Sequence, residues 1–329
     1  MAVADATRQR RAWEEQQRVF RRRRLIGLGL AIVLLVLGVR ACAGVVGGDD
    51  PAADRAAVPE LPRGGRQILP RYRVVAYYGA PQADELGVLG TTTPQVAAQK
   101  LVRSAHEFDR PGRPAMPAFE LIVTLAQEAP GQDGKHRLRQ TDKVITDYLR
   151  AVRAVRGLLI LDVQPGQADF VEEVRALQPY LLQPDVGLAL DPEWSVPAGT
   201  LPGSVIGSTD AATVNEVVDY LARVVRARNL PEKVLIVHQF TEKMVTDRDL
   251  IRERPGVKVV SNMDGFGTPP LKEGVYDQLS NKRPPRRGAP RVGQQPFNGF
   301  KLFYREDTGL MSPSDVLALN PAPDVVVYE

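Results

Sequence analysis

From Tyr72 to the end of the chain, short runs of β-branched and other apolar residues alternate with stretches whose apolar residues recur at helical spacing. Parallel strands need a crossover between them, usually a helix, so this alternation predicts a parallel sheet flanked by helices. We expect strands at 73–79, 118–127, 157–166, 185–194, 233–240, 257–267, 299–307 and 323–329. We expect the helices between them at 93–108, 140–155, 168–178, 211–228, 241–253, 271–280 and 312–319.

Eight strands in a region of this length predict an α/β fold of the (β/α)8, TIM-like barrel type, which typically needs roughly 250 residues. The final strand, 323–329, would close the ring beside the first strand, 73–79. The alternative is a doubly wound open sheet. Its dinucleotide-binding version is not supported, because no G-x-G-x-x-G follows the first strand.

The N-terminal part of the chain predicts a membrane anchor. The apolar run LIGLGLAIVLLVLGV over 25–39 continues past Arg40 to about Val46, and four arginines precede it. A spanning helix needs about 20 residues, and basic residues favour the cytoplasmic side. We therefore expect a basic cytoplasmic tail over 1–24 and, over 25–46, a single transmembrane helix or signal anchor in the lipid bilayer. A flexible linker over 47–70 and an extracytoplasmic barrel domain over 71–329 would follow.

Two other interpretations of this N-terminal segment stay open. Ala41-Cys42-Ala43 fits a small-x-small signal cleavage site, and Cys42 could instead carry a lipid. All three interpretations place the barrel domain outside the cytoplasm.

Composition excludes several classes of function. Much of the net charge of +4 comes from the first 24 residues and from a basic loop at 281–291, so nucleic-acid binding has little support. Cys42 is the one cysteine, and the three histidines show no H-x-x-x-H spacing. We therefore expect no disulfide, no thiol nucleophile, no metal site and no cofactor in the domain. The sequence also lacks a G-x-S-x-G elbow and a P-loop.

Polar and aromatic residues gather where the expected strands end. In (β/α)8 barrels the functional site lies at these carboxyl ends. Aromatic faces stack on sugar rings, and carboxylates and amides bind sugar hydroxyls, so the set favours a polysaccharide or other glycan ligand. The candidate ligand-binding residues are Tyr77, Tyr78, Gln164, Trp194, His238, Gln239, Asp264, Lys301, Tyr304 and Glu329.

Asp191-Pro192-Glu193 is the sharpest candidate for catalysis. In an extended chain these two carboxylates would point the same way, about 6.5–7 Å apart. Two carboxylates so near each other can have different pKa values, so that one keeps its proton and acts as an acid, as glycoside cleavage requires. We expect Glu193 as the acid, with Asp191 or Asp162 assisting. The alternative is a surface loop with solvated acids and a proline turn.

Other candidates also have structural interpretations. Asp162 could cap a helix, and Asp264 begins an Asp-Gly turn signal. His238 closes an apolar strand, where a hydrogen-bonded structural histidine is more common than a proton carrier. Lys301 lies between apolar residues and needs a carboxylate partner, for which Glu120 is the candidate.

The motifs VVAYYGAP, ILDVQPG, LALDPEW, VHQFT, MDGFG and KLFYREDT, spread over about 73–307, resemble an uncharacterised group of actinobacterial exported or membrane-anchored proteins. The Asp-x-Glu motif also resembles that of glycoside hydrolase barrels, including lysozyme-like muramidases. That resemblance implies Glu193 as the acid and Asp191 as its partner. Those muramidases carry an aspartate on the first strand, where this chain has Tyr77-Tyr78-Gly79.

The sequence therefore favours a membrane-anchored, glycoside hydrolase-like barrel that acts on a cell-envelope or other polysaccharide. A non-catalytic barrel that binds glycans or envelope partners is the alternative, and a tethered scaffold is a third possibility.

Overall fold

The computed structural model describes residues 58–281 and 297–329. The expected tail over 1–24, the expected membrane segment over 25–46 and the first part of the expected linker lie outside these residues. Within the described residues, no helix is both long enough and apolar enough to cross a membrane.

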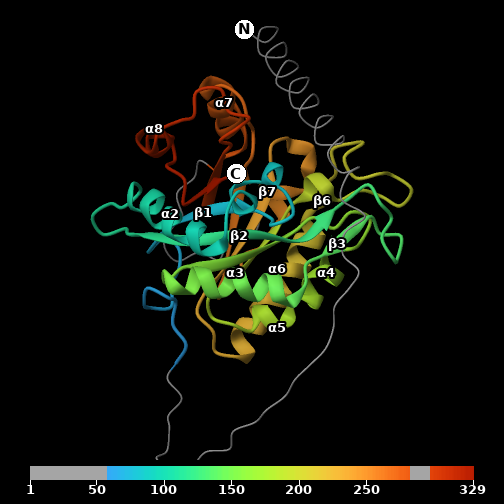
Figure 1. The fold of residues 1–329 in the computed structure, drawn as a ribbon, viewed down its shortest axis with the longest axis horizontal. Helices are drawn as coiled ribbons and strands as arrows, with labels where there is room; N and C mark the ends of the chain where they lie inside the picture. Colours follow the sequence, from blue (N-terminus) through green and yellow to red (C-terminus); the bar gives the residue numbers. More distant parts are fainter. Residues whose placement is uncertain (1–57, 282–296) are drawn as a thin grey trace, which may run out of the picture.

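Eight parallel strands form a closed barrel (Figure 1). Each strand pairs with the next in chain order, and the last pairs with the first through Val74 and Val325. This closure confirms the expected barrel rather than the open sheet. The strands are β1 (Arg73–Gly79), β2 (Ala115–Ala126), β4 (Leu158–Val163), β5 (Val186–Leu190), β7 (Lys233–Gln239), β9 (Val257–Met263), β10 (Phe297–Leu302) and β11 (Val325–Tyr328).

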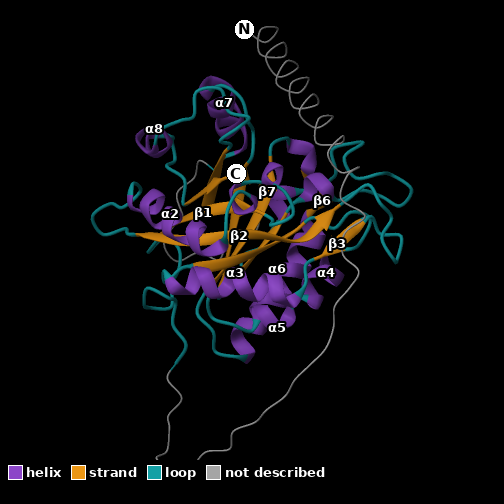
Figure 2. Cartoon of the chain, in the orientation of Figure 1, coloured by secondary structure: helices purple, strands orange, loops and turns teal. Residues whose placement is uncertain are grey.

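Helices surround the strands (Figure 2). Several begin with the caps that their sequences supply: the Thr93 side chain accepts a hydrogen bond from the backbone N–H of Val96, and Ser312 forms a capping box with Asp315. In Figure 1, α3 to α6 lie together on one side of the strands, and α7 and α8 lie on the opposite side. The helices are α2 (Pro94–His106), α3 (Asp142–Ala154), α4 (Phe170–Ala176), α5 (Gln178–Leu181), α6 (Ala211–Ala227), α7 (Pro269–Leu279) and α8 (Pro313–Ala318).

The prediction of a helix over 241–253 is wrong. The segment instead contains two 3-10 turns, η4 (Glu242–Met244) and η5 (Arg248–Leu250), around the short strand β8 (Val245–Thr246). Strand β8 pairs with β6 (Thr209–Asp210). Asp247 adopts a left-handed backbone conformation with φ of 53°, which a right-handed helix cannot contain. The crossover from β7 to β9 is therefore irregular.

Two apolar clusters hold the barrel together. The inner one includes residues that face the barrel axis, such as Ala76, Ala118 and Ala189, whose small side chains suit a narrow interior. The outer one joins the other face of the strands to the helices and includes Phe119 and Leu161. Because strand residues alternate between faces, this division fixes which polar side chains can reach the barrel interior.

A segment before β1 packs against the barrel at the amino ends of the strands. Leu61, Ile68 and Leu69 belong to the inner cluster. The backbone N–H of Ile68 donates to Glu232, and Arg66 donates to the backbone carbonyl of Leu230. The packed domain therefore includes residues that we expected to belong to the flexible linker over 47–70.

Candidate active site

Polar side chains replace the apolar ones where the interior reaches the carboxyl ends of the strands. We call this set the polar layer, and each of its members is less than 8% exposed. It holds five carboxyl groups and two basic side chains. The polar layer consists of Tyr78, Glu120, Asp162, Asp191, His238, Asn262, Asp264, Lys301 and Glu329.

The tilt of the strands sets the stagger of the polar layer. Tyr78 of β1 pairs with Glu120 of β2, whereas Asp162 of β4 pairs with Ile122, two residues further along β2. Asp162 in turn pairs with Ala189, two residues before Asp191. Because inward positions recur every second residue, the polar layer advances by two residues at these steps.

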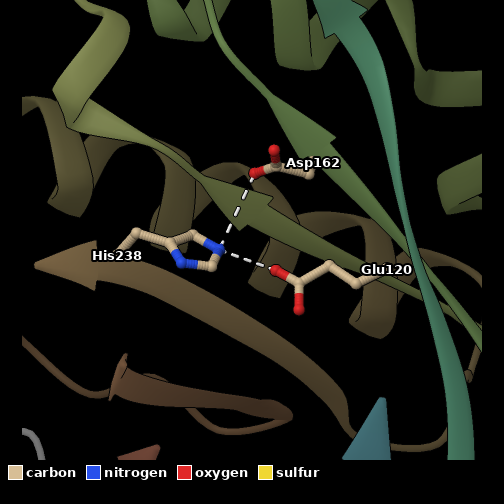
Figure 3. A group of neighbouring side chains, drawn as sticks. All are labelled: Glu120, Asp162 and His238. Carbon is tan, nitrogen blue, oxygen red and sulfur yellow. Dashed lines mark hydrogen bonds and ion pairs between the residues drawn. The ribbon is translucent and has the colours of Figure 1, made fainter. Parts of the chain in front are cut away.

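His238 lies between two carboxylates. Its Nδ1 is 2.6 Å from Asp264 Oδ2. Its Nε2 is 2.6 Å from Glu120 Oε1 and 3.9 Å from Asp162 Oδ1 (Figure 3). Burial alone would lower the pKa of His238, but the charges of Asp264 and Glu120 outweigh burial and raise it well above its usual value. The imidazole therefore acts as a buried cation in this arrangement.

Asp264 is held in its ionised form. Burial works against the charge, yet His238 and Lys301 lower the pKa of Asp264 below its ordinary value. Asn262 Nδ2 also donates to Asp264 Oδ1 at 2.6 Å. The expectation of a simple turn residue therefore misses the main role of Asp264, which is to orient and charge the histidine.

Lys301 is the second cation of the polar layer. Its Nζ lies 2.8 Å from Glu329 Oε2, 3.7 Å from Asp264 Oδ2 and 3.6 Å from the centre of the Tyr78 ring. Burial would lower the pKa of Lys301, but Glu329 and Asp264 raise it above the ordinary lysine value. The prediction that Glu120 is the partner of Lys301 is wrong, because Glu120 pairs with His238 instead.

Asp162 and Asp191 are linked through two neutral side chains. The Tyr78 hydroxyl donates to Asp162 Oδ2 at 3.0 Å, and Gln164 Nε2 donates to the Tyr78 hydroxyl at 3.0 Å and to Asp191 Oδ2 at 3.4 Å. Burial and the charge of Asp191 raise the pKa of Asp162 well above its usual value. Burial also raises the pKa of Asp191, to about 6. This pair can therefore keep a proton near neutral pH.

The extended geometry expected for Asp191-Pro192-Glu193 is wrong. Strand β5 ends at Leu190, and the 3-10 turn η3 (Pro192–Trp194) follows. The turn leaves Glu193 and Trp194 partly exposed, whereas Asp191 is buried. Asp191 therefore joins Asp162 in the polar layer, while Glu193 and Trp194 belong to the rim above β5.

Besides Gln164, Glu193 and Trp194, three expected site residues lie outside the polar layer. Tyr77 belongs to the outer cluster, where its hydroxyl lies 2.7 Å from Ser104 Oγ. Gln239 donates to the backbone carbonyl of Thr241. Tyr304 is 48% exposed and stacks on Tyr328 at 5.4 Å. Tyr77 and Gln239 adjoin polar-layer residues, and neighbours along a strand point to opposite faces.

The polar layer meets the surface at a small groove. The loop after β1, with 3-10 turns η1 (Asp84–Leu86) and η2 (Val88–Gly90), lies along this groove. Arg305, from the loop after β10, pairs with Asp84 at 2.6 Å. The groove has a volume of about 50 Å³ and is lined by Asp84, Glu85, Gly87, Val88, Thr91, Tyr304, Arg305, Glu306 and Glu329.

The loop that borders this groove packs tightly. Gly87 has φ of 109°, and a β-carbon there would lie 2.7 Å from the backbone oxygen of Tyr78. Only glycine allows this close approach.

Among the described residues, Glu120, Asp162 and His238 form a group that could hold a metal ion. Their ligand atoms lie within 4.8 Å of one another, and all three side chains are fully buried. Sequence reasoning excluded a metal site on histidine number and spacing. Histidine spacing along the sequence could not reveal these three ligands, because they come from three different strands.

No family model matches the sequence, and no curated protein matches it. Among solved structures, the cellulose synthase subunit Z (CcsZ) of Clostridioides difficile is similar in structure, with a TM-score of 0.38 and 9% sequence identity. The similarity covers 79% of this chain and 91% of that protein. The barrel assignment rests on the strand pairing of this chain and not on that similarity.

Proposed function

We propose that the protein is a glycoside hydrolase-like barrel that cleaves a polysaccharide at the carboxyl ends of its strands. The observation that carries this proposal is the linked pair Asp162 and Asp191, two buried carboxyl groups of which Asp191 has a pKa raised to about 6. Glycosidic cleavage needs a carboxylic acid that keeps its proton and a second carboxylate. A raised pKa supplies the first requirement.

In the proposed reaction Asp191 is the proton donor. It protonates the glycosidic oxygen as the bond between that oxygen and the anomeric carbon breaks. A water molecule then adds to the anomeric carbon and gives its proton to a carboxylate. Glu193, partly exposed two residues beyond Asp191, is our candidate for this second carboxylate. Burial is what keeps the proton on Asp191, and the fully buried Asp162 is linked to it through Tyr78 and Gln164.

Aromatic side chains at the rim support a sugar ligand. Trp194 follows β5 and is partly exposed, and Tyr304 follows β10 and is 48% exposed. Exposed aromatic faces can stack on pyranose rings. We therefore propose that the glycan binds across the rim, with Trp194 and Tyr304 as its platforms.

A second candidate function is a barrel that binds a glycan or an envelope partner without cleaving it. The observation that favours it is the small groove, about 50 Å³. Typical ligand pockets have volumes of about 300–1,000 Å³. In this alternative the polar layer has a structural role, and only the rim contacts the ligand.

We also propose that the barrel is attached to the cell membrane and lies outside the cytoplasm. This placement is supported only by the sequence, through the arginines at 21–24 and the apolar run over 25–46.

The experiment that separates the two functions measures turnover and binding together. Purified full-length protein would be incubated with peptidoglycan and a panel of envelope and plant polysaccharides. Release of reducing ends and retention on each insoluble polysaccharide would be followed in parallel. Release from at least one substrate is the expected result. Retention without release from any substrate would favour the non-catalytic function.

A further inference from the structure

We propose that Glu120, Asp162 and His238 bind a divalent cation of the zinc or manganese class inside the barrel, beneath the proposed glycan site. This inference goes beyond the proposed function, because it requires neither a glycan nor turnover. The three side chains come from β2, β4 and β7, so a shared ion would join strands that are far apart in the sequence.

The geometry of the three ligand atoms fits a shared ion. Metal–ligand bonds to imidazole nitrogen and carboxylate oxygen are about 2.0–2.2 Å long, so two ligands on one ion lie about 3–4 Å apart. His238 Nε2 and Asp162 Oδ1 are already 3.9 Å apart, and the ligand atoms of all three residues lie within 4.8 Å of one another (Figure 3). Glu120 Oε1, at 2.6 Å from Nε2, needs only a small outward movement.

Buried oxygen atoms at this position lack hydrogen-bond donors. Within the part of the chain that the structure describes, no donor reaches Glu120 Oε2, Asp162 Oδ1 or Asn262 Oδ1. The exposed fraction of each of these side chains is zero. A buried acceptor without a donor lowers stability, and a cation bound by the three residues would satisfy Asp162 Oδ1 directly.

The surroundings of His238 orient it as a metal ligand. Its Nδ1 lies 2.6 Å from Asp264 Oδ2, so an Nδ1–H bond to that carboxylate points Nε2 towards Glu120 and Asp162, where an incoming metal ion would displace the Nε2 proton and take its place. Asn262 Nδ2 donates to the other oxygen of Asp264 at 2.6 Å and fixes the carboxylate in turn. Histidine ligands of metals commonly have such a carboxylate partner on their second nitrogen.

The charge balance of the polar layer also favours a cation. Lys301 lies 2.8 Å from Glu329 Oε2 and 3.7 Å from Asp264 Oδ2, so its charge is directed to those two acids. Glu120 and Asp162 then depend on His238 for a positive charge. A divalent ion that displaces the Nε2 proton of His238 would bring two positive charges to these carboxyl groups, where the imidazolium brings one.

The ligand set indicates the class of cation. Magnesium and calcium prefer oxygen ligands alone, whereas imidazole together with carboxylates suits zinc and, among the harder ions, manganese. One imidazole and two carboxylates therefore favour a first-row divalent ion over magnesium or calcium.

The test is metal binding by the full-length protein in the absence of any glycan. Protein stripped with a chelator and desalted would be titrated with zinc chloride and with manganese chloride by calorimetry at constant pH. Bound metal after gel filtration would be counted by mass spectrometry. The expected result is about one equivalent of zinc or manganese bound in preference to magnesium, with a rise in Tm.

Substitutions locate the ion. Asp264→Asn should weaken binding by about 10–100-fold, the usual effect of losing a partner of a ligand. Asp162→Asn should weaken metal binding at least as much. If near-ultraviolet circular dichroism shows that Asp162→Asn is not folded, Glu120→Gln would be tested in its place. Asp185→Asn is the matched control, because it removes a buried carboxylate at the opposite end of the barrel, where Asp185 pairs with Arg153, and it should leave affinity within about threefold.

Two results would overturn the proposal. One is no uptake of zinc or manganese by folded wild-type protein at millimolar concentration. The other is an equal loss of affinity in Asp185→Asn and Asp162→Asn, which would indicate a diffuse attraction to buried acidic side chains. Neither result bears on polysaccharide cleavage, so the metal site and the proposed hydrolase function can fail separately.

Discussion

The side-chain oxygen of Asn262 occupies the space that a β-carbon at position 299 would need. An ideal β-carbon on Gly299 would lie 2.1 Å from Asn262 Oδ1, far inside van der Waals contact. The two residues are register partners on β9 and β10. Asn262 in turn donates to Asp264, the carboxylate partner of His238. The absence of a side chain at Gly299 therefore leaves room for the amide that holds Asp264 in place.

Gly299→Ala should therefore destabilise the fold. Forcing a methyl group into filled space costs about 1–3 kcal/mol, and here the fixed Asn262 amide and its backbone are the atoms that must move. Gly274→Ala, within α7, is the matched control because a β-carbon there meets no atom within 4 Å. It should stabilise the protein by up to about 1 kcal/mol. Urea unfolding measures both, and similar values would contradict the packing argument.

Lys301→Met should be strongly destabilising. It would leave Glu329 and Asp264 without their buried cation, and removing one member of a buried ion pair costs about 3–5 kcal/mol. The double variant Lys301→Met/Glu329→Gln should recover part of this loss.

Arg305→Met provides the comparison for Lys301→Met. Its ion pair with Asp84 is about half exposed on both sides, so thermal unfolding should detect no change. An equal loss of Tm in Arg305→Met and Lys301→Met would show that burial does not set the strength of the Lys301 pair.

Lys233 should make stability increase with pH above neutrality. Burial lowers the pKa of this lysine to about 7, although it donates to the backbone carbonyls of Gln183 and Val186. An unfolded lysine has a pKa of about 10.4, so between these values the unfolded chain binds more protons than the folded one. Stability then rises by up to about 1.4 kcal/mol per pH unit from pH 7 towards pH 10.

The measurement compares denaturant unfolding of wild type and Lys233→Met across that range. The stability of the wild type relative to Lys233→Met should increase with pH. Lys143→Met controls for the loss of one charge, since the side chain of Lys143 is 82% exposed. Parallel curves for wild type and Lys233→Met would contradict the prediction.

Trp194→Ala should weaken glycan binding without unfolding the barrel. Aromatic contacts of this kind contribute about 0.5–1.5 kcal/mol, so we expect a loss of affinity of up to about tenfold. Val96→Ala, an exposed apolar position on α2, is the control. Binding to the polysaccharide that the protein retains best would be measured by depletion assay, and unchanged affinity in Trp194→Ala would remove this side chain from the proposed rim.

The strand order and the closed barrel could be predicted because each strand carries its own signal of β-branched residues. Once the strands are located, the polar residues at their carboxyl ends follow. Five members of the polar layer lie within one residue of a strand end: Tyr78, Asp162, Asp191, His238 and Lys301.

The role of Glu120 could not be predicted. It lies in the middle of the long strand β2 and reaches the polar layer only because the strands tilt, which makes the layer cross each strand at a different height. The end of β5 was left open by the sequence, because Asp191-Pro192-Glu193 is compatible with an extended strand and with a proline turn, and only the structure shows the turn. Register and turns depend on tertiary packing, which local sequence signals do not contain.

The central claim is that Asp191 donates the proton that cleaves a glycosidic bond. The most direct measurement is the rate of reducing-end release by Asp191→Asn relative to wild type on a polysaccharide that the wild type cleaves. Asp185→Asn is the matched control, because it makes the same change just before the opposite end of β5, where Asp185 pairs with Arg153. The account predicts a loss of at least about 100-fold for Asp191→Asn, with binding retained and Asp185→Asn active. A wild-type rate in folded Asp191→Asn would contradict it.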